Sequence, residues 1–313
     1  MAKKFDFNKP LKWVLIVYAA IIVAGIAVTA IFGAKLSIDF KGGTVLTYNY
    51  QFEEGKIADI NVEDVKALVT EHIKADANVT KGASIAGNTY TITVSLVDNE
   101  AVTADAQDAF LKAMQKKYAD NNVSVYNSAS INPTLATSFF IKALAAVIVV
   151  AILVVIYVGF SFRKIGGVTA ALTALVALVL DVAVSFIACV AFRLPIDMNY
   201  IAVVLTILGY SLNDTIVVYD SVRENKKITE GLTLAQMVNK SLHDVIARNI
   251  VTTTTTVLAV ITIIVVSEIY GLTSLRPFAI PMVFGLLSGC ISSIFISTPL
   301  WVVWRNKLDA KKK

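Results

Sequence analysis

Six long apolar segments constrain this chain more than any other feature of its sequence. Each contains about 18 to 27 residues, enough for a helix that rises 1.5 Å per residue to cross a bilayer. They are Trp13–Phe32, Ala143–Phe160, Val168–Phe192, Met198–Tyr219, Asn249–Val266 and Phe278–Trp304. Apolar residues make up 56% of the 313 positions, which is more than a soluble protein of this length usually carries. The sequence therefore predicts an α-helical membrane protein with six transmembrane helices. The last segment contains Pro281 and Pro299 and has room to tilt or kink.

Lysines and arginines in the short connections indicate how these helices are oriented. Sixteen fall on one side of the predicted membrane, against only Arg193 and Arg276 on the other. Cytoplasmic loops carry the excess of basic residues, so we expect both termini to be cytoplasmic and residues 34–138 to lie outside. The sixteen are Lys3, Lys4, Lys9, Lys12, Arg163, Lys164, Arg223, Lys226, Lys227, Lys240, Arg248, Arg305, Lys307, Lys311, Lys312 and Lys313. The net charge of +5 is thus a signal of topology, and no basic run interleaved with aromatic residues suggests a nucleic-acid partner.

The first apolar segment follows a basic start, as a signal peptide also would. Its length of about 20 residues exceeds the ~7–15 of a signal-peptide core, so we interpret it as a retained anchor. The chain then divides into an N-terminus with the first helix, an outside domain, five further helices and a basic cytoplasmic tail. The expected boundaries are 1–33, 34–138, 139–304 and 305–313.

Residues 34–138 read as a small soluble domain. Apolar residues alternate where strands are expected and recur at helical spacing where helices are expected. The segments are Val45–Tyr50 (strand), Val62–Ile73 (helix), Tyr90–Leu96 (strand after a turn at Ala86–Asn88), Phe110–Tyr118 (helix) and Val123–Tyr126 (strand). The order β-α-β-β-α-β favours an extracytoplasmic α+β ferredoxin-like domain between the first two membrane helices. Acidic residues outnumber basic ones 13 to 9, and no nucleophile, metal cluster or phosphate loop is present, so we expect a binding or gating domain.

The cysteines and histidines offer no catalytic or metal site. Cys189 and Cys290 both fall in predicted membrane helices, where they would not meet an oxidant, so no disulfide is expected. His72 and His243 lie on opposite sides of the membrane in this topology. We therefore expect neither an enzyme nor a cofactor.

Asp214 is the most informative polar residue, because it lies several turns inside the fourth apolar segment, directly after Asn213. An ionised carboxylate near the bilayer centre costs roughly 2.5–3.5 kcal/mol on insertion scales. Such residues usually face the interior of a helix bundle and mark an ion or proton path, although a purely structural polar contact is an alternative. Asp181 lies inside the third segment in the same way.

Arg248 directly precedes the fifth segment, at the start of the expected fifth helix, and Thr252 lies one helical turn later on the same face. An arginine can extend along a helix toward a buried carboxylate, so we expect both residues to join Asp214 in a polar site. Alternatively, Arg248 anchors the helix at the interface and the threonine run is inert. A carboxyl group that exchanges an ion opposite a guanidinium would favour two packings of the bundle. One charge crossing the membrane supplies about 2.3 kcal/mol per 100 mV, enough to bias them. Gly285 and Gly289 form a small-xxx-small pair that predicts close helix packing.

Three motifs in the chain resemble the SecF family. The run GYSLNDTIVVYDSVREN, Gly209–Asn225, resembles the family's fourth-helix signature. Asp39, Gly42 and Gly43 lie in DFKGGT, which resembles its Asp-Phe-x-Gly-Gly-Thr element, and Arg248 with the following threonines resembles the start of its fifth helix. The family commonly has His-Asp in the third helix, whereas this chain has Leu180 before Asp181.

The resemblance implies a membrane subunit of the Sec protein-export machinery in the bacterial plasma membrane. Members pair with SecD within the resistance-nodulation-division superfamily and associate with the SecYEG channel. They use a proton or sodium gradient to help unfolded preproteins leave the channel on the outer side. The family's ion-pathway positions correspond to Asp214, Arg248 and Thr252. Six helices with one polar cluster also read as half of a two-part transporter whose site lies between the halves.

Three other interpretations remain open on the sequence alone. A small-molecule or lipid exporter of the same superfamily is the runner-up, although such chains are usually longer. Two intramembrane aspartates also suggest an intramembrane aspartyl protease, but Leu212-Asn213-Asp214 lacks the Gly-x-Gly-Asp element of that class. A structural assembly factor would have no need of the buried charges.

Overall fold

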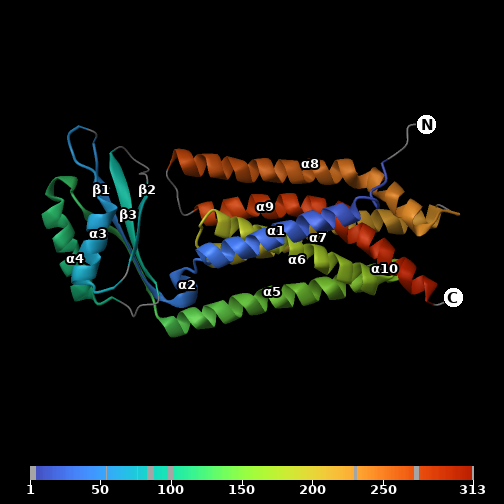
Figure 1. Ribbon diagram of the computed structural model, residues 1–313, viewed down its shortest axis with the longest axis horizontal. Coiled ribbons are helices and arrows are strands. Elements are labelled where there is room, and N and C mark those ends of the chain that lie inside the picture. Colours follow the sequence, from blue (N-terminus) through green and yellow to red (C-terminus); the bar gives the residue numbers. More distant parts are fainter. Residues whose placement is uncertain are drawn as a thin grey trace.

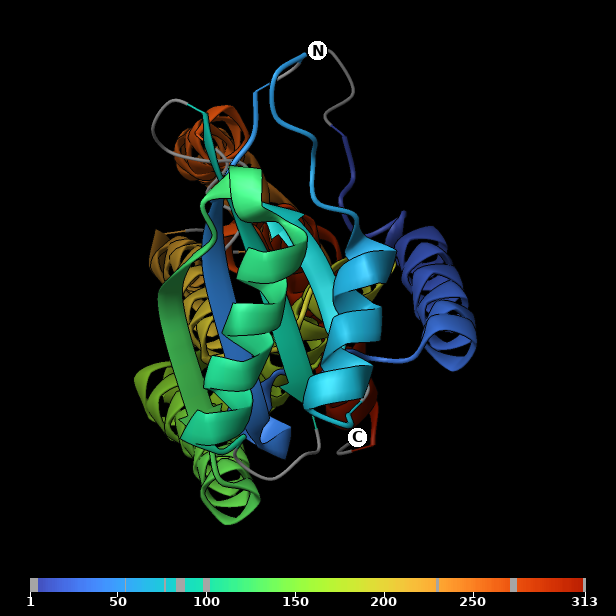
Figure 2. The same cartoon turned by 90° about the vertical axis from the view of Figure 1, so that its left-hand side faces the viewer.

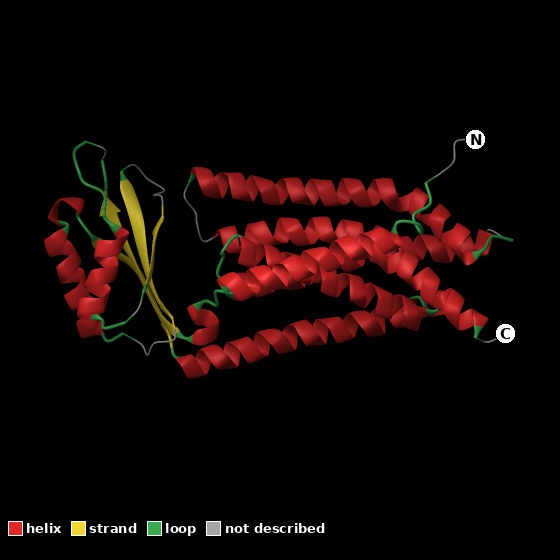
Figure 3. Cartoon of the chain, viewed as in Figure 1, coloured by secondary structure: helices red, strands yellow, loops and turns green. Residues whose placement is uncertain are grey.

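The computed structural model describes residues 5–53, 55–75, 77–82, 88–97, 102–228, 231–270 and 275–311. Figure 1 shows a bundle of long helices with a small domain at one end, and both marked termini lie at the opposite end. Strands are confined to the small domain (Figure 3). The turn expected at Ala86–Asn88 falls largely outside the described residues.

Six helical stretches in the described residues are long and apolar enough to span a membrane, which confirms the predicted class. They are α1 (Leu11–Phe32), α5 (Pro133–Ser161), α6 (Gly167–Ala191), α7 (Met198–Ile228), α8 (Leu234–Ile269) and the stretch Arg276–Ala310. Helix α7 continues past the predicted end at Tyr219, and α8 begins well before Asn249. The apolar pattern marks only the part of a helix that lies in lipid, so it misses the polar turns that extend beyond it.

The sixth stretch is interrupted near its second proline. It consists of α9 (Arg276–Ser292), a π-helical turn η4 (Ser293–Ser297) and α10 (Thr298–Ala310). Pro281 lies inside α9 without ending it, whereas Pro299 directly follows the π-helical turn. Because proline has no N–H, the carbonyl four residues before Pro299 lacks its usual donor, and the helical ladder changes there. Helix α10 consequently runs at an angle to α9 (Figure 1).

The small domain has the predicted ferredoxin-like topology. Its elements are β1 (Gly43–Gln51), α3 (Val62–His72), β2 (Asn78–Gly82), β3 (Thr89–Val97), α4 (Ala104–Lys117) and β4 (Ser124–Ile131), with a short turn η1 (Ala119–Asn121) before β4. The sheet order is β2-β3-β1-β4 and every neighbouring pair is antiparallel. Helices α3 and α4 cover one face of this sheet (Figure 2). Edge strand β2 has only one buried residue, Val79, and therefore shows no alternating pattern in the sequence.

The core of the domain lies between the sheet and its two helices. Leu46, Tyr48 and Tyr50 alternate along β1 and point into this core. The Tyr48 ring packs on Phe110 of α4 with centroids 5.6 Å apart. Burial raises the pKa of the Tyr48 hydroxyl to about 12, so this side chain stays neutral at physiological pH.

A short helix, α2 (Ile38–Lys41), joins α1 to β1 and was not predicted. The two glycines that follow it both have positive φ, +82° for Gly42 and +131° for Gly43. A Cβ on Gly42 would lie 2.6 Å from the Cα of Pro133, and one on Gly43 would lie 2.0 Å from the carbonyl oxygen of Leu96. Glycine is therefore required at both positions, because the entry to the domain touches the start of α5 and strand β3 there.

Candidate functional site

Asp214 lies at the junction of α7 and α8, buried to 1% exposure. The Thr253 hydroxyl donates a hydrogen bond of 3.2 Å to its carboxylate. The Asn249 side chain donates one of 3.3 Å to its backbone carbonyl. Both partners are neutral and come from consecutive turns of α8. The carboxyl group therefore points into the bundle, as expected for an acid inside an apolar span.

Arg248 and Asn213 lie on the outer side of the same junction. Both are exposed within this chain and line a groove of about 510 Å³ between α7 and α8. Among the ion pairs of the described residues, none joins Arg248 to Asp214, although the guanidinium is close enough to attract the carboxylate electrostatically. The groove is lined by Asn213, Ile216, Val217, Asp220, Ser221, Glu224, Asn225, Ile228, Asp244, Val245 and Arg248.

Thr252 does not contact the buried carboxyl group in this structure. Its hydroxyl donates within its own helix, to the carbonyls of Arg248 at 2.9 Å and Asn249 at 3.0 Å. Helical spacing explains the difference from the expected contact. Thr252 shares a face with Arg248, which is the outward face, whereas Asn249 and Thr253 share the face turned toward α7. Thr253 is therefore the α8 hydroxyl at the carboxylate, and the sequence analysis missed it.

Asp181 of α6 is completely buried and is surrounded by serine hydroxyls. Ser211 of α7 and Ser288 of α9 each donate a hydrogen bond of 2.6 Å to its carboxylate, and Ser292 donates one of 2.9 Å. The Tyr18 hydroxyl of α1 lies 2.9 Å from that of Ser288 and so joins this group, which we call the Asp181 cage. No ion pair in the described part of the chain involves Asp181. Three hydroxyl donors stabilise a carboxylate without adding charge.

Close packing of α9 brings the Asp181 cage together. A Cβ on Gly285 would lie 2.1 Å from the Cδ1 of Ile207, and one on Gly289 would lie 3.0 Å from the Cβ of Ser211. The small-xxx-small pair thus lets α9 approach α7 closely, which confirms its predicted packing role. Ser288 and Ser292 are one turn apart on α9. Whether they reach Asp181 depends on where α6 crosses α9, which no sequence pattern indicates.

Further buried hydroxyls continue from the Asp181 cage toward α10. Thr215 of α7 donates a 3.1 Å hydrogen bond to Ser293. The Tyr219 hydroxyl lies 3.0 Å from that of Thr173 on α6 and 2.9 Å from that of Ser297. Ser293 and Ser297 bound the π-helical turn. Polar side chains thus line the contacts between α6, α7 and the sixth stretch, and π-helical turns are frequent at functional sites.

The glycine motif connects the domain to the start of α7. The Asp39 carboxylate accepts a hydrogen bond of 3.3 Å from the Met198 N–H, the first residue of α7. A β-bridge pairs Leu36 with Ile196, reinforced by a 3.0 Å hydrogen bond from the Ser37 N–H to the Ile196 carbonyl. Asp197, beside this bridge, accepts from the Tyr200 N–H at 3.0 Å, and its burial together with the Asp39 charge raises its pKa.

Gly209, the first residue of the longest motif, has a different setting. It is exposed on α7, and apart from the neighbouring backbone of its own helix no described residue lies within 4 Å of where its Cβ would be. Asn213 follows one turn later on the same outward face. Among the described residues, no packing contact requires a glycine at this position.

Comparisons with known proteins agree with this architecture. The model of the C-terminal region of the SecD/SecF protein export membrane proteins matches residues 110–307. The chain is 33% identical to protein translocase subunit SecF of Alicyclobacillus acidocaldarius, over 98% of this chain and 95% of the relative. It is 32% identical to protein translocase subunit SecDF of Bacillus subtilis, over 97% of this chain and 39% of that relative. The crystal structure of the translocon-associated membrane protein SecDF from Thermus thermophilus superposes with a TM-score of 0.79 at 26% identity, covering 97% of this chain and 39% of that one. The chain thus spans about two fifths of the SecDF proteins it matches.

Proposed function

The chain belongs to the SecD/SecF family of protein export membrane proteins, and from this premise we propose that it is a SecF subunit of the bacterial Sec export machinery. In this proposal it is a multi-pass, non-enzymatic transport subunit of the plasma membrane. It uses a proton or sodium gradient to help preproteins leave the SecYEG channel on the outer side. Both termini are cytoplasmic and the ferredoxin-like domain lies outside, which agrees with the shared location of the termini in Figure 1 and with the basic residues at that end.

The burial of Asp214 is the observation that carries the proposal. The Asp214 carboxyl group is 1% exposed inside an apolar span, and its hydrogen-bond partner among the described residues is a neutral hydroxyl. Such a carboxyl group is costly to keep charged and is readily neutralised by an ion. Arg248 lies nearby without an ion pair to it in the described residues. Binding of an ion at Asp214 would weaken its attraction to the guanidinium. The two states would then favour different packings of α7 against α8.

The outward face of α7 supports a partner bundle. Gly209 leaves open space on this face, and the polar side chains of Asn213 and Arg248 line the groove beside it. Contact with lipid would be unfavourable for such a surface. A second six-helix bundle, which we assign to SecD, would cover this groove and place its own polar residues near Asp214. The site would then lie between two halves, as in other transporters built from repeats.

Asp181 belongs to the proposed ion pathway as a second, inner acid. Its cage contains only neutral hydroxyl donors, so an ion that reaches it meets oxygen ligands throughout. Asn213, Arg248 and Thr252 would act from the groove side, where the partner bundle completes the site. The exporter alternative has no support in the relatives, which are protein translocase subunits.

Preprotein release from membrane vesicles under an imposed pH or sodium gradient tests the proposal. Vesicles contain SecYEG, SecD and either the unaltered chain, Asp214→Asn or Asp309→Asn. Asp309 is an exposed acid at the end of α10 and serves as the matched control. We expect Asp214→Asn to abolish the stimulation by the gradient while the complex still assembles, and Asp309→Asn to retain it. Full stimulation with Asp214→Asn would refute ion coupling at this residue, and the gradient that works would identify the ion.

A further inference from the structure

A basic groove lies at the end of the bundle opposite the domain. Its volume is about 390 Å³, and it is formed where α5 ends, at the turn η2 (Arg163–Ile165) and along the last turns of α7. Four of its six lining residues are basic and none is acidic. The lining is Phe160, Ser161, Arg163, Lys164, Arg223 and Lys227.

Contacts within the chain fix the shape of this groove. The Arg163 guanidinium lies 5.2 Å from the centre of the Phe160 ring, and Arg223 lies 5.8 Å from that of Phe162. Lys226 donates a hydrogen bond of 2.9 Å to the Lys164 carbonyl and so holds η2 against α7. Cation–π contacts of this kind restrict the arginine rotamers before any ligand binds.

Most of the positive charge in the groove has no acidic partner among the described residues. Arg223 pairs with Asp220, one turn earlier on α7. Among the ion pairs of the described residues, none involves Arg163, Lys164 or Lys227, and all three are exposed. Within the described part of the chain, the groove therefore presents about three unpaired positive charges to an anion.

The groove also borders a surface of α5 that is apolar and exposed in this chain. Phe160 is 71% exposed and continues a row of exposed apolar residues on α5, which are Ile152, Leu153, Ile156 and Tyr157. A ligand in the groove thus meets basic groups at one end and an apolar helix face at the other. We propose that this groove binds the phosphate of an anionic phospholipid, whose acyl chains lie along α5. Arginine and lysine pockets at the ends of membrane helices suit such headgroups, and arginine bonds phosphate with two donors at once.

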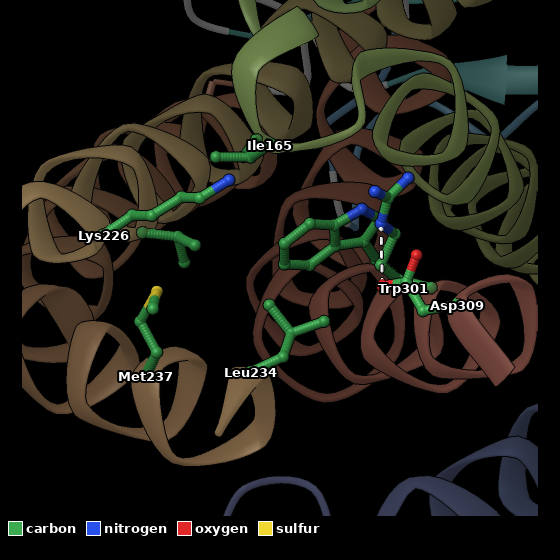
Figure 4. Close-up of a pocket in the computed structure, with 8 residues that line it drawn as sticks. Ile165, Lys226, Leu234, Met237, Trp301 and Asp309 are labelled. Carbon is green, nitrogen blue, oxygen red and sulfur yellow. Dashed lines mark ion pairs between the residues drawn. The ribbon is translucent and has the colours of Figure 1, made fainter. Parts of the chain in front are cut away.

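A neighbouring pocket at the same end of the bundle is mostly apolar and has less unpaired positive charge than the basic groove. It measures about 240 Å³ and lies between η2, α7, α8 and α10 (Figure 4). Its Arg305 is already paired with Asp309 at 3.3 Å, and the Trp301 indole N–H donates to Thr169 at 3.2 Å. The remaining lining is mostly apolar, and among the described residues that line this pocket Lys226 is the one basic group without an acidic partner. We therefore assign the phosphate to the basic groove and not to the pocket in Figure 4.

Lipid binding to the purified full-length chain tests the assignment. Delipidated protein is titrated with phosphatidylglycerol, with phosphatidylcholine of the same acyl chains and with inorganic phosphate, and bound lipid is counted by native mass spectrometry. The groove variant carries Arg163→Gln and Lys164→Gln. The matched control carries Lys307→Gln and Lys311→Gln, two exposed lysines of the C-terminal end outside the groove.

We expect the groove variant to lose phosphatidylglycerol affinity by about 25-fold, or fivefold for each charge removed, while the control retains it. Phosphatidylcholine binding is expected to stay the same in all variants. Equal losses in both double variants, or no loss in either, would overturn the assignment. Inorganic phosphate competing at the same concentration as phosphatidylglycerol would show that the groove takes free phosphate and not lipid.

The single variant Lys227→Gln repeats the test on the exposed surface of α7, so the assignment stays testable if the double variant does not fold. The inference needs only that the six helices span a membrane. Because export is not measured, its failure would leave the proposed function standing.

Discussion

Thr253→Val and Thr252→Val form a matched pair that tests where the structure places the buried acid. The two threonines are adjacent on α8, and each substitution replaces a hydroxyl by a methyl group of similar volume. Thr253 donates to the Asp214 carboxylate at 3.2 Å, whereas Thr252 donates only to carbonyls of its own helix. The structure therefore predicts different losses of stability from the same chemical change.

The expected magnitude follows from the partners. Hydrogen bonds between membrane helices contribute about 0.6 kcal/mol on average and up to about 1.7 kcal/mol. The Thr253 bond ends on a buried carboxylate, so we expect a loss near the upper value, about 1–1.5 kcal/mol of unfolding free energy. The Thr252 hydroxyl bonds to carbonyls that already accept helical hydrogen bonds, so its removal is expected to change the stability by less than about 0.5 kcal/mol.

Equilibrium unfolding of the purified chain in mixed micelles with increasing SDS measures both values. A double-mutant cycle with Asp214→Asn isolates the pairwise energies. We expect a coupling of about 1 kcal/mol between positions 253 and 214 and none between 252 and 214. Coupling of Asp214 to Thr252 but not to Thr253 would refute the register of α8 against α7 described above.

Two further predictions concern the domain. Gly42→Ala is expected to lower the free energy of unfolding by about 2–4 kcal/mol, because it combines a positive φ with a Cβ 2.6 Å from the Cα of Pro133. Gly55→Ala, at φ +81° and with no described atom within 4 Å of the new Cβ, is expected to lose only the backbone contribution of about 1–2 kcal/mol. Thermal unfolding measures both losses, and equal losses would contradict the close approach of Gly42 to Pro133. Burial raises the pKa of Asp59, but hydrogen bonds from Lys81 at 2.5 Å and Tyr50 at 2.9 Å outweigh it and hold the pKa below its ordinary value. The pair therefore stabilises the domain above the unfolded-state pKa of about 3.9, and this stabilisation is lost as the pH falls through the folded-state pKa. Lys81→Met is expected to flatten that acid dependence in the hydrogen exchange of strand β2, and an unchanged acid dependence would show that the pair does not set it.

The sequence predicts the membrane spans and the topology of the domain well, because both depend on local patterns. The thickness of a bilayer sets the length of an apolar run, and alternation marks β1 and β3. Strand β2 escapes prediction because an edge strand with one buried residue has no alternation to detect. The π-helical turn η4 is not predicted, because it depends on how the chain accommodates Pro299.

The sequence predicts less about the polar sites than about the fold. Position along the chain identifies Asp214 and Asp181 as buried acids, since each lies deep in an apolar run. Their partners depend on how helices cross, so Thr253 takes the place expected for Thr252, and the serines around Asp181 have no local signature. Arg248 lines a groove between α7 and α8, and that groove also depends on how the two helices cross.

The bridge between Leu36 and Ile196 couples the N-terminal end of α7 to the segment that enters the domain. Asp214 lies 16 residues after Met198, a separation of about 24 Å along the helix. If α7 pivots at Asp214 by about 5°, its N-terminal end moves about 2 Å and carries the bridge to the domain with it. A small rotation at the buried acid would thus become a larger displacement where the domain joins the helix bundle.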